Sequence, residues 1–272
     1  MPLDTAVTAE AEAEVLYEVG DHVATLTLNR PERMNTISGP MLARLTELLL
    51  QADRDAEVRC IVLTGRGRAF CAGLDLTGAS KGELGLQGAS QATTLDLRAT
   101  PPTVLFNLET PTICALNGSA AGYGMDTALG CDMRIMAEGA KLAAAFTKRG
   151  VVPESGGTWL LPRLIGWSRA SELIFTGRTL TAAECLDWGL CSRVVPDAEL
   201  PEAARALALE VAANAPLAVQ AAKRMMRMGL SETFNDHVHH VFLQLLPLVK
   251  TEDAYEGMRA FMEKRPAVFR GR

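Results

Sequence analysis

The chain has 272 residues, of which 48% are hydrophobic and 22% charged, proportions typical of a globular protein. Its net charge of −5 argues against a nucleic-acid-binding surface, which needs clustered lysine and arginine. No apolar run approaches the roughly 20 residues that a membrane-spanning helix requires. Neither nucleic acid nor a membrane is therefore an expected partner.

The six cysteines are scattered, mostly through apolar segments, and form no C-x-x-C pair. This pattern indicates the reduced, buried thiols of a cytoplasmic protein rather than a disulfide framework. The first 14 residues are acidic and rich in alanine, and they lack the basic and apolar regions of a secretory signal. We expect residues 1–14 to form a disordered tail.

In chain order, the first predicted element is a β-hairpin over residues 15–28, in which two alternating runs flank a Gly-Asp turn. Apolar residues at helical spacing then predict a helix with Ser38 as its N-cap. The nearly continuous apolar run at 58–63 predicts a strand that is covered on both faces. Residues 77–94 are mostly small and polar, and we expect a mobile loop there.

The following segments alternate between strand and helix patterns, which indicates an α/β domain. Thr181 to Glu184 form a capping box that predicts a helix ending at Gly189. Only helical patterns remain after residue 197, so we expect an α/β core over residues 15–196 and a helical region over residues 197–272. The other predicted elements are helices at 95–108, from 123, from 156 (short), 201–213, 216–228, 231–246 and 251–264, and strands at 112–116, 133–137 and 142–146.

Two glycine-containing segments, residues 71–76 and 117–126, each follow a strand-like apolar run that ends at glycine. The second segment leads into the predicted helix that begins at Tyr123. Glycine allows the backbone to approach a ligand closely, and the start of a helix presents free N–H groups to negative charge. Two such N–H groups from separate loops would hold an oxyanion, which is a catalytic device. Neither segment carries the G-x-G-x-x-G pattern of a dinucleotide-binding loop.

Two carboxylates accompany these segments. Asp126 follows Tyr123 by about one helical turn, and taken alone it is best interpreted as an acid stabilised by the helix dipole. Glu154 lies between a proline and a glycine pair, where it could equally be an acid in the first turn of a helix. A half-buried carboxylate in a cleft, however, tends to have a raised pKa that suits proton transfer.

His237 and His240 share one face of a predicted helix, an arrangement that suggests a metal site. No carboxylate or cysteine at an obvious ligand spacing accompanies them. We therefore interpret them as solvated or interface histidines and expect no metal.

Taken together, these segments resemble the enoyl-CoA hydratase/isomerase (crotonase) superfamily over about residues 15–269. The resemblance implies a spiral of ββα units with a helical C-terminal trimerisation region. It also implies an acyl-CoA thioester substrate, which brings coenzyme A with it, so that no separate cofactor is expected. The expected assembly is a homo-oligomer, either a trimer or a dimer of trimers. The matching segments are residues 28–31, 69–76, 117–132, 153–158, 161–166, 189–190, 194–196 and 261–264.

By the same resemblance, the oxyanion donors are the backbone N–H groups of Leu74 and Tyr123. Many relatives carry glycine where this chain has Tyr123, but the expected donor is a main-chain group that any residue except proline supplies. The residues that the resemblance assigns to coenzyme A or substrate binding are Arg33, Met34, Ala72, Gly73, Asp75, Leu76, Gly122, Phe146, Phe261 and Lys264.

The sequence departs from the hydratase pattern at two positions. Well-known enoyl-CoA hydratases have catalytic glutamates where this chain has Asp126 and Phe146, and phenylalanine cannot transfer a proton. Glu154 instead matches the acidic position of relatives that shift double bonds, open ring epoxides or displace halide from aromatic acyl-CoAs.

We therefore expect an acyl-CoA enzyme in which Glu154 moves a proton and Asp126 assists. Isomerisation needs Glu154 alone and hydration needs both acids, so the residues leave these two reactions open. Other crotonase chemistry on an aromatic or ring acyl group is an alternative. A non-catalytic relative that binds coenzyme A or RNA is a further alternative.

Overall fold

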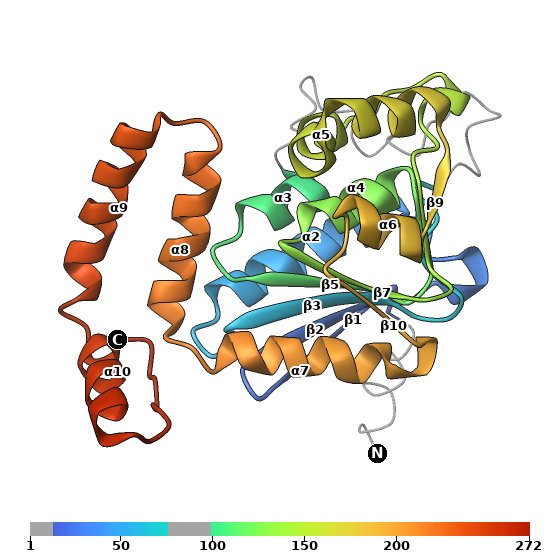
Figure 1. The fold of residues 1–272 in the computed structure, drawn as a ribbon. Coiled ribbons are helices and arrows are strands. Elements are labelled where there is room, and N and C mark those ends of the chain that lie inside the picture. The colour runs from blue at the N-terminus through green and yellow to red at the C-terminus, as the bar shows by residue number, and fades with distance from the viewer. Residues whose placement is uncertain (1–12, 76–98) are drawn as a thin grey trace, which may run out of the picture.

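The computed structural model describes residues 13–75 and 99–272, which form two sheets with helices packed around them (Figure 1). The larger sheet has six strands in the order β1-β2-β3-β5-β7-β10 and is parallel except for the antiparallel β1–β2 hairpin. Its strands are β1 (Val15–Gly20), β2 (Val23–Leu28), β3 (Cys60–Gly65), β5 (Thr112–Leu116), β7 (Met133–Ala137) and β10 (Arg193–Val195).

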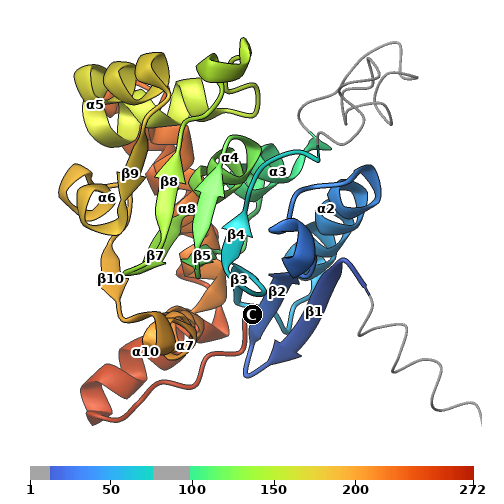
Figure 2. The ribbon, with the colours of Figure 1, turned by 90° about the vertical axis from the view of Figure 1, so that its right-hand side faces the viewer.

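The smaller sheet has the strand order β4-β6-β8-β9. Each of β3, β5 and β7 in the larger sheet is followed along the chain by a strand of the smaller sheet, so the strands alternate between the two sheets. Figure 2 shows β4 and β8 continuing upward from the larger sheet toward α4 and α5. The four strands are β4 (Ala69–Cys71), β6 (Ser119–Ala121), β8 (Lys141–Ala143) and β9 (Thr179–Thr181).

Helices cover both faces of the larger sheet: α2, α3 and α4 lie above it in Figure 1, and α7 lies below it. The buried β3, β5 and β7 strands are mostly apolar because they have no solvent-facing side. The helices are η1 (Pro31–Arg33), α2 (Gly39–Arg54), α3 (Pro101–Asn107), α4 (Tyr123–Gly130), η4 (Thr147–Arg149), α5 (Gly157–Thr176), α6 (Ala182–Trp188), η5 (Asp197–Glu199), α7 (Leu200–Ala212), α8 (Pro216–Gly229), α9 (Phe234–Leu248) and α10 (Glu252–Glu263).

The structure confirms most of the predicted elements. The hairpin forms over residues 15–28, and the Ser38 side chain accepts a hydrogen bond from the Met41 amide at the start of α2. The capping box of Thr181 and Glu184 is also present, with both of its hydrogen bonds. The predicted 95–108 helix is described only from Ala99, and α3 begins at Pro101.

Two predicted elements differ from the structure. The strand expected at 142–146 ends at Ala143, after which the chain leaves the sheet and forms the short 3-10 helix η4. The short helix expected from residue 156 is α5, which extends to Thr176 with a break at Gly166, where φ is 77°. Glu154 therefore lies at a junction between a loop and a helix rather than directly after a strand.

The helices after α7 stand away from the sheets, whereas α7 itself packs against β3, β5 and β7 (Figure 1). Arg59 at the edge of the core holds the chain end in place by donating a hydrogen bond of 3.0 Å to the Phe269 carbonyl oxygen. Among the residues that the structure describes, no helix is both long and apolar enough to cross a membrane. Of the predicted N-terminal tail, Ala13 and Glu14 are described, and Glu14 pairs with Arg30 at 3.0 Å. Residues 1–12 and the loop predicted at 77–94 lie outside the described ranges.

Candidate active site

A pocket of about 110 Å³ lies where the ends of β4 and β6 meet the start of α4. It contains seven of the residues that the sequence predicts for the site, drawn from four separate segments of the chain. Its lining residues are Ala72, Gly73, Leu74, Ala121, Gly122, Tyr123, Ala145, Phe146, Arg149, Val151 and Glu154. The parallel pairing of β4 with β6 and of β6 with β8 brings these segments to one edge of the smaller sheet.

The two backbone amides that the sequence predicts as oxyanion donors both line this pocket. Tyr123 is the first residue of α4, so its N–H has no acceptor within the helix. Leu74 forms an isolated parallel β-bridge with Ile37. The hydrogen bonds of this bridge are accepted by the Gly73 carbonyl oxygen and donated by the Asp75 amide, so they do not use the Leu74 N–H. Within the described ranges, neither amide donates to another protein group.

The loops that carry these amides are almost in contact. A Cβ atom added at Gly73 would lie 3.0 Å from the Ala121 carbonyl oxygen and 3.8 Å from the Tyr123 nitrogen. Gly73 also has a φ of +104°, which is strained for any residue with a side chain. Gly73 is therefore required both for its conformation and for the close approach of the two donor loops.

Glu154 is the only carboxylate among the described residues that line the pocket. It is half-buried and lies just before α5, between the buried Pro153 and the buried Ser155. Burial raises the pKa of the Glu154 carboxyl, and its own backbone amide opposes this rise in part. A carboxylate of this kind, facing a pocket with two free amides, can accept and return a proton.

Asp126 lies behind the pocket and does not line it. It is in the first turn of α4 and is fully buried. The Ser155 amide donates to Asp126 Oδ2 at 3.3 Å, which links the carboxylate to the segment that carries Glu154. Burial and the negative charge of Glu154 together raise the pKa of Asp126 to about 7. The two acids are thus electrostatically coupled, and only Glu154 is open to a ligand.

Phe146 is buried and lines the pocket. Arg149 on η4 also lines the pocket, with its side chain exposed and one guanidinium N–H donating to the Ala145 carbonyl oxygen at 2.9 Å. Arg149 is not among the residues predicted from the sequence, because only the fold places it one 3-10 turn after Phe146.

The predicted coenzyme A-binding residues before α2 pack against the first donor loop. The Met34 carbonyl oxygen accepts a hydrogen bond of 3.0 Å from the Ala72 amide. Arg33 lies 3.8 Å from the Asp75 carboxylate, which also pairs with Arg30 at 3.2 Å. This part of the predicted site therefore adjoins the pocket at Ala72.

Two predicted site residues lie elsewhere in the chain. Phe261 and Lys264 belong to the end of α10, which Figures 1 and 2 place at the opposite end of the molecule from α4 and α5. They do not line the pocket of their own chain. Leu76 lies outside the described residues.

The two histidines of α9 have an acidic neighbour that the sequence analysis missed. One Glu232 oxygen lies 2.9 Å from His237 Nδ1, and the other lies 2.9 Å from His240 Nδ1. Glu232 precedes these residues by five and eight positions, across the turn before α9, so simple helical spacing does not reveal the contact. Within residues 13–75 and 99–272, no group of three or more histidine, cysteine or carboxylate side chains is arranged so that it could hold a metal ion.

Known proteins resemble this chain over nearly its whole length. The family model for enoyl-CoA hydratase/isomerase matches residues 18–272. The chain is 38% identical to 1,2-epoxyphenylacetyl-CoA isomerase of Escherichia coli, over 95% of this chain and 98% of the relative. It is 36% identical to (E)-benzylidenesuccinyl-CoA hydratase of Thauera aromatica, over 94% of this chain and 99% of that protein.

A solved structure of enoyl-CoA hydratase from Bacillus anthracis superimposes with a TM-score of 0.89 at 35% identity, over 96% of this chain and all of that one. The chain belongs to the enoyl-CoA hydratase/isomerase family. It is therefore an enzyme of a family that acts on acyl-CoA thioesters, and the predicted crotonase-type α/β fold is confirmed.

Proposed function

We propose that this enzyme isomerises an unsaturated or ring-containing acyl-CoA by moving a proton between carbon atoms next to the thioester. The observation that carries the proposal is the position of Glu154, which shares one small pocket with the free amides of Leu74 and Tyr123. Phe146 occupies the position of a second catalytic glutamate and cannot exchange protons. One accessible acid is enough for isomerisation.

In this mechanism the thioester oxygen accepts hydrogen bonds from the Leu74 and Tyr123 amides. Glu154 removes a proton from the α-carbon or γ-carbon, and the electron pair moves onto the thioester oxygen to form an enolate. Protonation of the enolate by Glu154 at a different carbon completes the shift and regenerates the carboxylate. Donors aimed at a developing oxyanion each contribute about 2.7–4 kcal/mol to transition-state stabilisation in well-studied cases.

Coenzyme A enters as part of the substrate, and proton transfer of this kind requires no separate cofactor. We assign the thioester end to Ala72, Gly73, Gly122 and Phe146, since they surround the two amides. Arg33 and Met34 are assigned to coenzyme A because their segment adjoins Ala72. Asp75 would hold the basic side chains of this segment in place through its pairs with Arg30 and Arg33.

Hydration is the second candidate reaction, because Asp126 could act with Glu154 in orienting water. The relatives include both a hydratase and an epoxide isomerase by name. The burial of Asp126 behind the pocket favours isomerisation, since a water-orienting acid must touch the water. In this proposal Asp126 tunes the charge of Glu154 instead.

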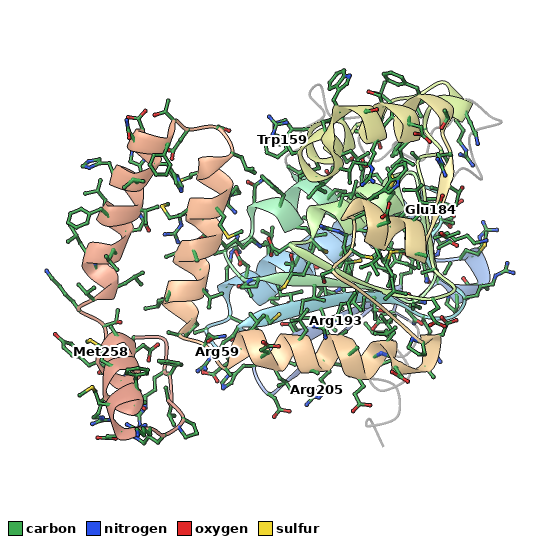
Figure 3. All side chains as sticks on the ribbon, viewed as in Figure 1. Arg59, Trp159, Glu184, Arg193, Arg205 and Met258 are labelled. Atoms are coloured by element: carbon green, nitrogen blue, oxygen red, sulfur yellow. The ribbon has the colours of Figure 1, made fainter. Side chains whose placement is uncertain are left out.

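We also propose that the chain assembles as a trimer through the region of residues 197–272. Large apolar side chains are exposed on α8, α9 and α10, including Met226, Phe234 and Phe242. Figure 3 shows side chains of α9 and α10, with Met258 among them, standing away from the core. In a trimer, Phe261 and Lys264 of one chain would reach coenzyme A bound to a neighbour, which explains their distance from their own pocket.

The cytoplasm is the proposed location of the enzyme. The support for this assignment is the set of six cysteines, all of which are free and buried. Buried thiols of this kind persist where the surroundings are reducing. Burial raises the pKa of several of them, including Cys71 beside the donor loop, so these thiols stay protonated and unreactive.

The proposal is tested by incubating the enzyme with a panel of 2-enoyl- and 3-enoyl-CoAs. Conversion of a 3-enoyl-CoA to the 2-enoyl form is expected, with growth of the conjugated thioester absorbance and no change in mass. A product heavier by one water molecule as the dominant outcome would favour hydration instead. Absence of either product across acyl lengths and ring types would contradict the proposed function.

A further inference from the structure

The direction of the Leu74 N–H is set by a hydrogen bond to the other end of its own peptide group. A peptide group is planar and trans, so the N–H of Leu74 points away from the carbonyl of Gly73. The Ile37 amide donates a hydrogen bond of 2.8 Å to that Gly73 carbonyl oxygen. On the other side of Leu74, the Asp75 amide donates to the Ile37 carbonyl oxygen at 2.9 Å. Ile37 therefore fixes the orientation of the first oxyanion donor.

The same geometry repeats one peptide group further from the pocket. The N–H of Ile37 shares a peptide group with the Thr36 carbonyl and points away from it. The Thr36 carbonyl oxygen accepts a hydrogen bond of 2.7 Å from Nη1 of Arg30. Two peptide groups in series, Thr36–Ile37 and Gly73–Leu74, thus connect the Arg30 guanidinium to the Leu74 N–H, and we call them the peptide relay. Hydrogen bonds in such a chain polarise and strengthen one another.

The Arg30 side chain is held where its charge can act on the peptide relay. It is 14% exposed, so solvent ions screen its charge incompletely. Its Nη2 pairs with the Asp75 carboxylate at 3.2 Å, and its Nε pairs with the Glu14 carboxylate at 3.0 Å. Because the guanidinium is a rigid planar fork, these two pairs direct Nη1 at Thr36. The carboxylates also offset part of the positive charge.

The two oxyanion donors differ in what polarises them. The Tyr123 N–H lies at the start of α4, where the aligned peptide dipoles of the helix create a positive potential. Leu74 lies in a β-bridge, and β-structure has only a small net dipole. A cation at the far end of the peptide relay supplies to Leu74 the positive potential that a helix supplies to Tyr123.

Resting on the proposed function, we propose that Arg30 is a positioning residue that orients and polarises the Leu74 N–H through the peptide relay. The guanidinium draws electron density from the Thr36 carbonyl oxygen, which makes the Ile37 N–H a stronger donor to Gly73. The Leu74 N–H in turn becomes a stronger donor to the thioester oxygen. Arg30 acts without touching the substrate, and its effect is greatest when negative charge develops on that oxygen.

The test measures the C=O stretching frequency of a bound thioester by isotope-edited infrared difference spectroscopy. The probe is hexanoyl-CoA, with and without carbon-13 at its thioester carbonyl. This frequency falls as the hydrogen bonds to the oxygen become stronger. Arg30→Gln is expected to raise the frequency above the wild-type value. It should also lower kcat on a 3-enoyl-CoA by about 2- to 8-fold, which corresponds to losing about 10–30% of one donor's contribution.

Glu14→Gln separates polarisation from a merely structural role. Glutamine can still accept the hydrogen bond from Arg30 Nε, but it removes a negative charge that offsets the guanidinium. The carbonyl frequency is therefore expected to fall below the wild-type value, whereas a loosened loop would raise it. This variant decides the question if Arg30→Gln does not fold. Arg66→Gln is the matched control, because this exposed arginine donates to Asn29 Oδ1 at 3.3 Å, outside the peptide relay. It should keep the wild-type frequency and kcat.

The outcomes separate the inference from the function on which it rests. An unchanged carbonyl frequency in Arg30→Gln, or an unchanged or higher one in Glu14→Gln, would overturn the inference. An equal shift in Arg66→Gln would overturn it too, because surface charge alone would then explain the effect. In each of these cases the proposed function stands if the wild type isomerises 3-enoyl-CoAs. If hexanoyl-CoA does not bind to the wild type, or binds with no fall in its carbonyl frequency, the proposed function fails as well.

Discussion

The carboxyl groups of Asp126 and Glu154 lie close enough to interact but in surroundings that separate their roles. Asp126 is fully buried and has a pKa of about 7, raised first by burial and then by the charge of Glu154. Glu154 is half-buried, burial raises its pKa, and it faces the pocket. The acid that is only half-buried is therefore the one that can reach a substrate, as a general base must.

The raised pKa of Asp126 leads to a prediction about stability. The folded state holds the Asp126 proton up to about pH 7, whereas an unfolded aspartate releases it near pH 4. The contribution of the protonated Asp126 to the free energy of unfolding is fully present below pH 4. It is lost as the pH rises to 7, by at most about 1.4 kcal/mol per pH unit. The free energy of unfolding should therefore fall less between pH 5 and pH 7 in Asp126→Asn than in the wild type, as measured by urea denaturation.

The change in slope is the diagnostic quantity, because groups that do not interact with Asp126 titrate equally in both proteins. If Asp126→Asn shifts the unfolding free energy by the same amount at pH 5 and pH 7, Asp126 does not carry a raised pKa. Its role in tuning Glu154 would then also be wrong.

The N–H of Tyr123 can be removed without disturbing the helix, since proline is well tolerated at the first helical position. Tyr123→Pro is expected to lower kcat by about 10²–10³-fold, the loss observed when one oxyanion donor is deleted. Tyr123→Ala is the matched control, because it removes the same side chain and keeps the N–H. Similar rates for the two variants would mean that this amide does not bind the thioester oxygen.

At the residue scale, the sequence predicted Leu74, Tyr123 and Glu154 because each is marked by local chemistry: a glycine-containing loop, a helix start, or a proline–glycine junction. It could not predict that Asp126 lies behind the pocket, since that depends on how α4 packs. Arg149 was missed because an exposed arginine has no distinctive sequence pattern, and only the fold places it beside Phe146.

At the scale of elements, the site depends on the close approach of α4 to β4. A Cβ atom added at Gly124 would lie 2.2 Å from the Cys71 carbonyl oxygen, a distance that no side chain tolerates. Because the contacted atom belongs to the backbone and cannot move like a flexible side chain, an alanine at position 124 must push the two donor-bearing segments apart. The glycine therefore sets the spacing between the two oxyanion donors.

We expect Gly124→Ala to destabilise the fold by about 1–3 kcal/mol, as overpacking typically does. We also expect kcat to fall more than the loss of folded protein explains. Gly39→Ala on α2 is the control, because nothing lies within 4 Å of a Cβ atom there. Urea denaturation and turnover per folded molecule are the measurements, and wild-type values for Gly124→Ala would contradict the packing argument.

The predicted elements agree best with the structure where a single local pattern dominates, as in the hairpin, α2 and the capped α6. The strand expected at 142–146 shows the opposite case, because its apolar residues continue past the point where the chain leaves the sheet. Those residues, Phe146 among them, are apolar because they line a pocket and not because they form a strand. A run of apolar residues does not distinguish these two causes.

At the scale of the whole molecule, the exposed apolar side chains of α8, α9 and α10 are the basis for the proposed assembly. We expect light scattering at micromolar concentration to give a mass near three or six times the 29.2 kDa of one chain. A monomer under these conditions would refute the assembly. The sequence predicted these helices well, but it could not place Phe261 and Lys264, because their expected target belongs to another copy.

The central claim is that Glu154 transfers the proton in a pocket where two amides hold the thioester oxygen. The most direct test compares Glu154→Gln and Asp126→Asn on a 3-enoyl-CoA, following the absorbance of the conjugated thioester and the affinity for coenzyme A. We expect Glu154→Gln to lower kcat by about 10²–10⁴-fold with little change in that affinity, and Asp126→Asn to have a smaller effect. Near-normal turnover by Glu154→Gln, with activity abolished in Asp126→Asn, would contradict the account and reverse the two roles.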